Sequence, residues 1–138
     1  MASQRILEWQ QRAAAEGAPG LNDPGASGSS TSHDFAFTDG VTLEALRRDQ
    51  AAFATERGWD KFHTPRNILL ALVGEVGELS ELFQWRGDEG SRPGLPEWSE
   101  EDKVHLGEEM ADVFNYLIRL ADRCEVDLPA AVRRKLER

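Results

Sequence analysis

The sequence predicts an all-α protein. Between residue 42 and the end of the chain, four segments place apolar residues at helical spacing, and two of them begin with a clear capping signal. No segment alternates apolar and polar residues as a half-buried strand does. The length of 138 residues allows one domain with a modest core. Because four helices of this size bury limited surface, we expect a four-helix bundle that assembles as a homo-oligomer.

The first two helices are delimited by their end signals. The first is predicted over residues 42–57, and Gly58 follows it as a helix-terminating glycine. The second is predicted over residues 64–85, because Thr64 suits the N-cap and Pro65 suits the first helical position. The side chains expected to be buried from the first helix are Leu43, Leu46 and Phe53.

The third and fourth helices follow a loop rich in glycine and proline. The third is predicted over residues 99–123, starting at a capping box in which Asp102 replaces the usual glutamate. The fourth is predicted from Asp127 to the end of the chain. The apolar stripe of the third helix, expected to face the core, comprises Leu106, Met110, Val113, Leu117, Leu120 and Cys124.

The first part of the chain has a different composition. Residues 3–16 could form a short amphipathic helix, and a stretch rich in glycine, proline and serine follows it. We therefore predict an N-terminal extension with a flexible linker over residues 1–37 and a helical domain over residues 38–138.

Composition excludes several classes of function. A net charge of −9 with no basic stripe argues against nucleic-acid binding. No run of about 18 apolar residues exists, so no membrane-spanning helix is expected. Cys124 is the single cysteine, so no intramolecular disulfide can form, which favours a reducing compartment such as the cytoplasm. Its side chain is expected to be a small buried hydrophobe. Organellar targeting by the N-terminal extension stays open.

Two acidic pairs border the apolar stripes of the second and third helices: Glu75 with Glu78, and Glu109 with Asp112. Members of each pair are three residues apart, so they share a helix face. If the helices pack antiparallel, four carboxylates converge and must be neutralised by protonation, a basic partner or metal ions. Oxygen-only ligands favour hard cations, and Mg²⁺ fits better than a di-iron centre, which would require Glu-x-x-His pairs.

A single E-x-x-E pair on a helix more often marks a solvated face than a site. Two such pairs beside apolar stripes weaken that interpretation. Gly74 and Gly77 weaken it further, because each glycine costs about 1 kcal/mol within a helix and indicates close approach of a backbone or a ligand. The sequence contains no phosphate-binding loop, dinucleotide fingerprint or nucleophile elbow.

Two longer segments, ERGWDKFHTPRNILLALVGEVGELSELFQWRGD and EEMADVFNYLIRLADRCEVDLPAAV, resemble the MazG-like all-α nucleoside triphosphate pyrophosphatases. They are most similar to the dCTP pyrophosphatase branch, and the resemblance covers roughly residues 42–135. It implies a dimer or a dimer of dimers, with sites shaped by helices from more than one subunit. It also implies hydrolysis of a deoxynucleoside triphosphate to the monophosphate and pyrophosphate, with a role in nucleotide-pool sanitation.

The resemblance assigns roles to the acidic residues. Glu75, Glu78, Glu109 and Asp112 match the metal ligands of the family, with Mg²⁺ as the expected ion and Mn²⁺ as a substitute. Bound ions would bridge the phosphates and activate a water for attack on the α-phosphorus. Glu75 and Glu78 are the expected catalytic residues, and Glu78 is preferred for orienting or deprotonating that water.

The resemblance also predicts contacts with the nucleotide. Aromatic faces stack nucleobases, and tyrosine against the sugar could reject a ribose. Taken singly, each of these residues could also be an ordinary core, interface or solvated side chain. The expected substrate-binding residues are Trp59 and Trp85 for the base, Tyr116 for the sugar, His63 and Gln50 for further contacts, and Arg66 and Arg86 for the phosphates.

Two departures from the family leave alternatives open. Gln50 stands where the branch usually has histidine, so preference could shift from dCTP or a modified dCTP to dUTP or another triphosphate. The family continues past the Lys135 position with polar residues that can help to hold phosphates, whereas this sequence stops at Arg138. A non-catalytic helical module that binds nucleotide or metal is therefore the remaining alternative.

Overall fold

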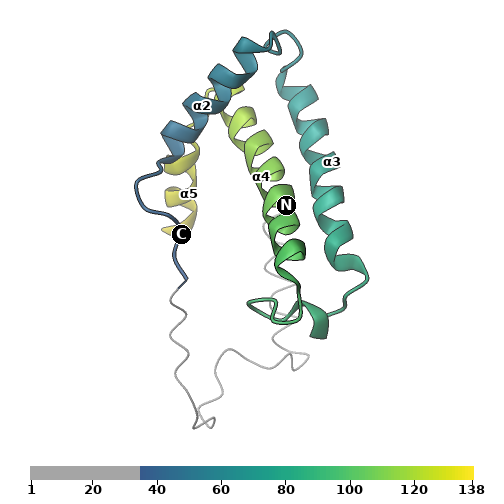
Figure 1. Ribbon diagram of the computed structural model, residues 1–138. Helices are drawn as coiled ribbons and strands as arrows, with labels where there is room; N and C mark the ends of the chain where they lie inside the picture. Colours follow the sequence, from purple (N-terminus) through teal and green to yellow (C-terminus); the bar gives the residue numbers. More distant parts are fainter. Residues whose placement is uncertain (1–34) are drawn as a thin grey trace. The chain divides into compact units, whose positions relative to one another are not determined.

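The computed structural model describes residues 35–138, and within them the fold is all-α (Figure 1). Residues 38–138 form one compact unit. The predicted all-α class is confirmed, whereas the amphipathic helix predicted over residues 3–16 lies outside the described residues. None of the described helices is long and apolar enough to cross a membrane. The elements are α2 (Leu43–Glu56), α3 (Pro65–Gln84), the 3₁₀ helix η1 (Glu89–Ser91), α4 (Glu100–Arg123) and α5 (Leu128–Leu136).

Each α-helix begins at a side-chain cap, as predicted for α3 and α4. The Thr42 hydroxyl accepts from the Ala45 backbone amide at 3.1 Å. The Thr64 hydroxyl caps α3 in the same way, and Pro65 occupies its first turn. Ser99 and Asp102 form the reciprocal capping box of α4, and the Asp127 carboxylate caps α5. A capping side chain satisfies an amide that the helix itself cannot pair, which explains why these starts follow from the sequence.

The helices α3 and α4 lie side by side and antiparallel, which is the arrangement that the predicted metal site requires (Figure 1). The loop between them is anchored by Trp98, which is 5% exposed. Its indole N–H donates to the Gly90 carbonyl at 2.8 Å, and its ring lies 5.0 Å from that of Phe83. The Arg86 guanidinium sits 4.0 Å above the Trp98 ring and pairs with Asp102 at 3.2 Å. This cluster fixes the turn that sets α4 against α3.

The buried core is smaller than the apolar stripes predicted. Among the described residues, the buried hydrophobic side chains are Ala54, Ile68, Trp98, Leu106 and Ile118. The helices pack as a thin layer, with α4 mainly against α3 and α2, so several apolar faces stay exposed among the described residues. Cys124 is exposed, so its predicted burial is wrong. The predicted burial is also wrong for Leu46, Phe53, Met110 and Leu117, which are 37%, 47%, 51% and 40% exposed.

Two apolar stripes therefore remain on the surface. The α3 stripe comprises Leu69, Val73 and Val76, and the α4 stripe comprises Met110, Phe114 and Leu117. Each follows i, i+4, i+7 spacing and so occupies one side of its helix.

Candidate active site

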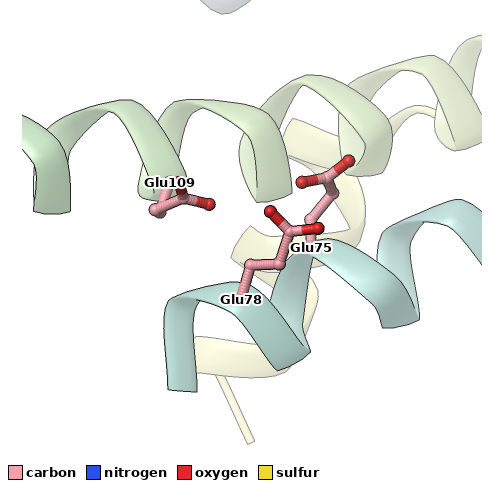
Figure 2. A group of neighbouring side chains, drawn as sticks. All are labelled: Glu75, Glu78 and Glu109. Atoms are coloured by element: carbon pink, nitrogen blue, oxygen red, sulfur yellow. The ribbon is translucent and has the colours of Figure 1, made fainter. Parts of the chain in front are cut away.

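Three of the four predicted carboxylate ligands converge between α3 and α4. Glu75 and Glu78 project from successive turns of α3, and Glu109 reaches toward them from α4 (Figure 2). Each offers an oxygen, and these oxygens lie within 4.8 Å of one another. Asp112 lies outside this group, yet its charge is close enough to raise the pKa of Glu75. The antiparallel packing expected from the sequence thus produces a carboxylate cluster.

The electrostatics of the cluster are unfavourable without a cation. Desolvation raises the pKa of Glu75 above its ordinary value, and the negative charges of Glu78, Asp112 and Glu109 raise it further. On α4, Glu109 Oε1 lies 3.1 Å from His105 Nε2, while Glu109 Oε2 is buried without a hydrogen-bond partner. A buried carboxylate oxygen without a partner costs free energy unless a bound group satisfies it.

The donor set fits a hard divalent cation. The cluster supplies only carboxylate oxygens, and one of them is already desolvated and directed at no protein donor. Such ligands suit Mg²⁺, Mn²⁺ or Ca²⁺ better than softer metals. A cation held by Glu75, Glu78 and Glu109 would offset both the mutual repulsion and the unsatisfied oxygen.

Replacing Glu75 by glutamine is expected to raise the melting temperature of the metal-free protein at neutral pH. Because the folded-state pKa of Glu75 exceeds its ordinary value of 4.5, the ionised form destabilises the fold. Wild-type protein recovers that stability as the pH falls through the raised pKa, and recovery is complete below 4.5. The gain of Glu75→Gln should therefore shrink on acidification. Thermal unfolding in a chelator across a pH series checks this.

The matched control is Glu81→Gln, which makes the same change on the exposed side of α3, outside the cluster. It should leave the pH dependence unchanged. A Glu75→Gln variant that is less stable than wild type at neutral pH would contradict the repulsion described above.

Several predicted substrate residues lie around the α2–α3 connection and the facing part of α4. The Trp59 ring is 42% exposed and lies 5.9 Å from the ring of His63. Gln50 reaches from α2 to α4, where its amide donates to the Asn115 carbonyl, and its Oε1 is buried without a partner. Tyr116 follows Asn115 and is half-buried.

The remaining predicted residues lie elsewhere. Trp85 is the C-cap of α3 and is 87% exposed. Since the 20 residues of α3 separate it from Trp59, the two tryptophans stand about 30 Å apart along the helix. Arg86 contacts the Trp98 ring and pairs with Asp102. Arg66 lies exposed in the first turn of α3. One chain therefore does not bring both tryptophans or both arginines to the carboxylates.

Two site residues were missed by the sequence reasoning. His105 and Arg119 stand in the same polar stripe of α4 as Glu109, and that shared register is the signal that could have identified them. His105 lies against Glu109, and Arg119 binds the ring of His63. At Gly74 and Gly77, an added Cβ would meet nothing within 4 Å, so no other described part of the chain approaches them closely.

Comparison with known proteins places this chain among pyrophosphatases. None of the protein-family models matches the chain. The chain is 54% identical over 115 residues to dCTP pyrophosphatase 1 of Bos taurus, covering 82% of this chain and 67% of that protein. It is 51% identical over 115 residues to dCTP pyrophosphatase 1 of Homo sapiens, covering 83% and 66%. It thus spans about two thirds of the length of these curated relatives.

A solved structure supports the same fold. The crystal structure of a pyrophosphatase from Archaeoglobus fulgidus superimposes with a TM-score of 0.62 at 35% sequence identity. The match covers 75% of this chain and 93% of the archaeal chain.

Proposed function

The chain belongs to the dCTP pyrophosphatase branch of the MazG-like all-α nucleoside triphosphate pyrophosphatases, and we propose that it hydrolyses dCTP to dCMP and pyrophosphate. The observation that carries the reaction is the carboxylate cluster of Glu75, Glu78 and Glu109, with the buried, unpartnered Oε2 of Glu109. The proposed role is nucleotide-pool sanitation in the cytoplasm, with no nucleic-acid partner.

The residues in and around the cluster have different proposed roles. Mg²⁺, with Mn²⁺ as a substitute, would neutralise the triphosphate and lower the pKa of the attacking water when bound by the cluster. His105 orients Glu109 through the contact with Oε1, which leaves Oε2 for the cation. Asp112 completes the acidic set from the next turn of α4. Glu78 is exposed at the cluster and is the carboxylate that accepts the proton of the water attacking the α-phosphorus.

Gln50 favours a base that carries an amino group. Its amide nitrogen donates to the Asn115 carbonyl. Its Oε1 is buried without a partner and, as an amide oxygen, can only accept a hydrogen bond. Cytosine offers an exocyclic amino donor, whereas uracil presents a carbonyl acceptor at the same ring position. This supports dCTP, or a modified dCTP that keeps the amino group, over dUTP. Tyr116 follows Asn115 on α4, where it can contact the sugar.

The site is proposed to be completed by a second copy of the chain, in a dimer or a dimer of dimers. Trp59 precedes α3 and Trp85 ends it, so a base pocket with both walls needs Trp85 from another copy. The exposed α3 and α4 stripes supply the apolar surface that such an assembly would bury. Arg66 and Arg86 would contact phosphates only where the assembly brings them to the cluster.

A triphosphate panel with product identification tests the proposed reaction. Wild-type protein with Mg²⁺ should release pyrophosphate from dCTP faster than from dUTP. Gln50→Leu should lower the dCTP-to-dUTP preference by about tenfold or more, because it removes the buried acceptor. Gln84→Leu, which changes an exposed glutamine at the end of α3, is the matched control and should leave the preference unchanged.

The alternatives give different results in the same panel. Faster hydrolysis of dUTP or of another triphosphate would keep the reaction of the family but identify a different substrate. A panel with no pyrophosphate release, from a protein whose metal binding and oligomer are intact, would leave a non-catalytic nucleotide- or metal-binding module.

A further inference from the structure

A buried arginine links the α2–α3 connection to α4. Arg119 is 3% exposed, and each side of its guanidinium has a partner. One terminal nitrogen donates to Asp60 at 2.5 Å, and the other donates to Asp122 at 2.8 Å. The remaining Nε–H donates to Nδ1 of the His63 ring at 3.1 Å. Each of the three guanidinium nitrogens of Arg119 thus has a partner, and none of these three bonds goes to the carboxylate cluster.

This contact fixes the protonation of His63. A guanidinium has no acceptor, so the Nδ1 atom facing Arg119 must present a lone pair, and the ring hydrogen must lie on Nε2. A protonated ring would set N–H against N–H and place two positive charges in contact. Consistently, burial lowers the pKa of His63, and the positive charges of Arg119 and Arg123 lower it further while Asp60 opposes them.

The surroundings hold the imidazole in one orientation. The Thr55 hydroxyl donates to Asp60, and Arg47 donates to Asp122, so both anions beside Arg119 are themselves anchored from α2. The backbone amide of His63 donates to the Trp59 carbonyl at 3.1 Å. The network therefore sets the position of the His63 ring relative to Trp59.

We propose that Arg119 is a positioning residue of the nucleotide site: it holds His63 as a neutral imidazole with its hydrogen on Nε2, the donor that meets the nucleotide beside Trp59. The role of the donor rests on the proposed function, whereas the tautomer does not. Because the neutral ring is required, nucleotide affinity should fall when the pH is low enough to protonate His63. The charged groups that influence the pH at which His63 becomes protonated are Asp60, Arg119 and Arg123.

The tautomer is tested by long-range ¹H–¹⁵N NMR of the histidine side chains in the full, ligand-free protein. A His63→Asn variant assigns the signal. Wild-type His63 should be neutral at pH 7 with its hydrogen on Nε2, and should titrate at lower pH than an ordinary histidine. A ring with its hydrogen on Nδ1, or a ring that is protonated at pH 7, would overturn the proposal.

A pair of variants tests the coupling. Arg119→Lys keeps the positive charge but cannot reach all three partners, so it should mix the tautomers of His63 and raise KM for dCTP about tenfold. The change in kcat should be smaller than the change in KM. Arg123→Lys is the control, because Arg123 donates to the His63 backbone carbonyl and not to the ring. It should leave the tautomer and KM near wild type.

The outcomes separate the two proposals. The expected tautomer in a protein that hydrolyses no triphosphate would refute the proposed function alone. Turnover that is normal in Arg119→Lys, with the pH profile of KM unchanged, would reduce Arg119 to a purely structural ion pair and overturn its positioning role.

Discussion

Glu109→Gln is expected to slow pyrophosphate release from dCTP by roughly 10²- to 10⁴-fold. Glu109 supplies the carboxylate oxygen that is buried without a protein partner, so its negative charge is the one most dependent on a bound cation. A catalytic cation contributes several kcal/mol of transition-state stabilisation, and each 1.36 kcal/mol corresponds to about tenfold in rate. Glutamine keeps the shape of the side chain but is a much weaker ligand for a hard cation.

Steady-state kinetics at saturating Mg²⁺ measure this loss, and thermal unfolding with and without Mg²⁺ measures cation binding. Wild-type protein should be stabilised by Mg²⁺ in proportion to the logarithm of its concentration above Kd, and Glu109→Gln should lose most of that shift. Glu81→Gln, the same change outside the cluster, should keep both the rate and the Mg²⁺ effect. Equal rates in Glu109→Gln and wild type would exclude the cluster as the catalytic centre.

Val73→Lys is expected to dissociate the proposed oligomer and to lower turnover with it. Val73 is 63% exposed at the centre of the α3 stripe, where a partner would bury it. Burying a valine-sized side chain is worth about 1.5–3 kcal/mol, and a two-fold interface loses the contribution twice. A lysine there adds the desolvation of a charge, so the dissociation constant should rise by at least about 10²-fold.

Light scattering or sedimentation measures the assembly, with dCTP hydrolysis assayed at the same protein concentration. Val104→Lys is the matched control, because Val104 is 62% exposed on α4 but lies off the Met110, Phe114 and Leu117 stripe. It should remain assembled and active. A wild-type monomer that is fully active would show that one copy suffices and would refute the shared base pocket.

Helix boundaries were predictable because local chemistry determines them. The caps at Thr42, Thr64, Ser99 and Asp127 each pair backbone amides within the first turn, so a few neighbouring residues carry the whole signal. Gly58 has φ +67°, a conformation that glycine adopts without strain, so it marks the turn after α2 equally well.

Burial was predicted less well because it depends on which helices have neighbours. The periodicity of α4 is correct, but α4 packs mainly on α3 and α2, and Met110 and Leu117 stay exposed instead of entering a core. Cys124 is exposed for a related reason, since it caps the C-terminal end of α4. The apolar residues of a sequence show which helix faces favour burial, but not which neighbour covers them.

In the candidate site, too, residues set by local spacing were predictable and residues set by distant contacts were not. Glu75, Glu78 and Glu109 were predictable because three-residue spacing on two antiparallel helices places them together. Arg119 was not, because its partners Asp60 and His63 lie more than fifty residues away in sequence and no local pattern joins them. The position of Trp98 likewise depends on its contacts with Phe83 and Arg86, which form only when the loop folds.

Hydrolysis of dCTP in ¹⁸O-labelled water with Mg²⁺ tests the central claim most directly. Attack of water on the α-phosphorus should give dCMP and pyrophosphate in equal amounts, with the label in dCMP alone, and a chelator should stop the reaction. Label in pyrophosphate, release of dCDP and phosphate, or hydrolysis that continues in the chelator would contradict a cation-dependent pyrophosphatase built on Glu75, Glu78 and Glu109.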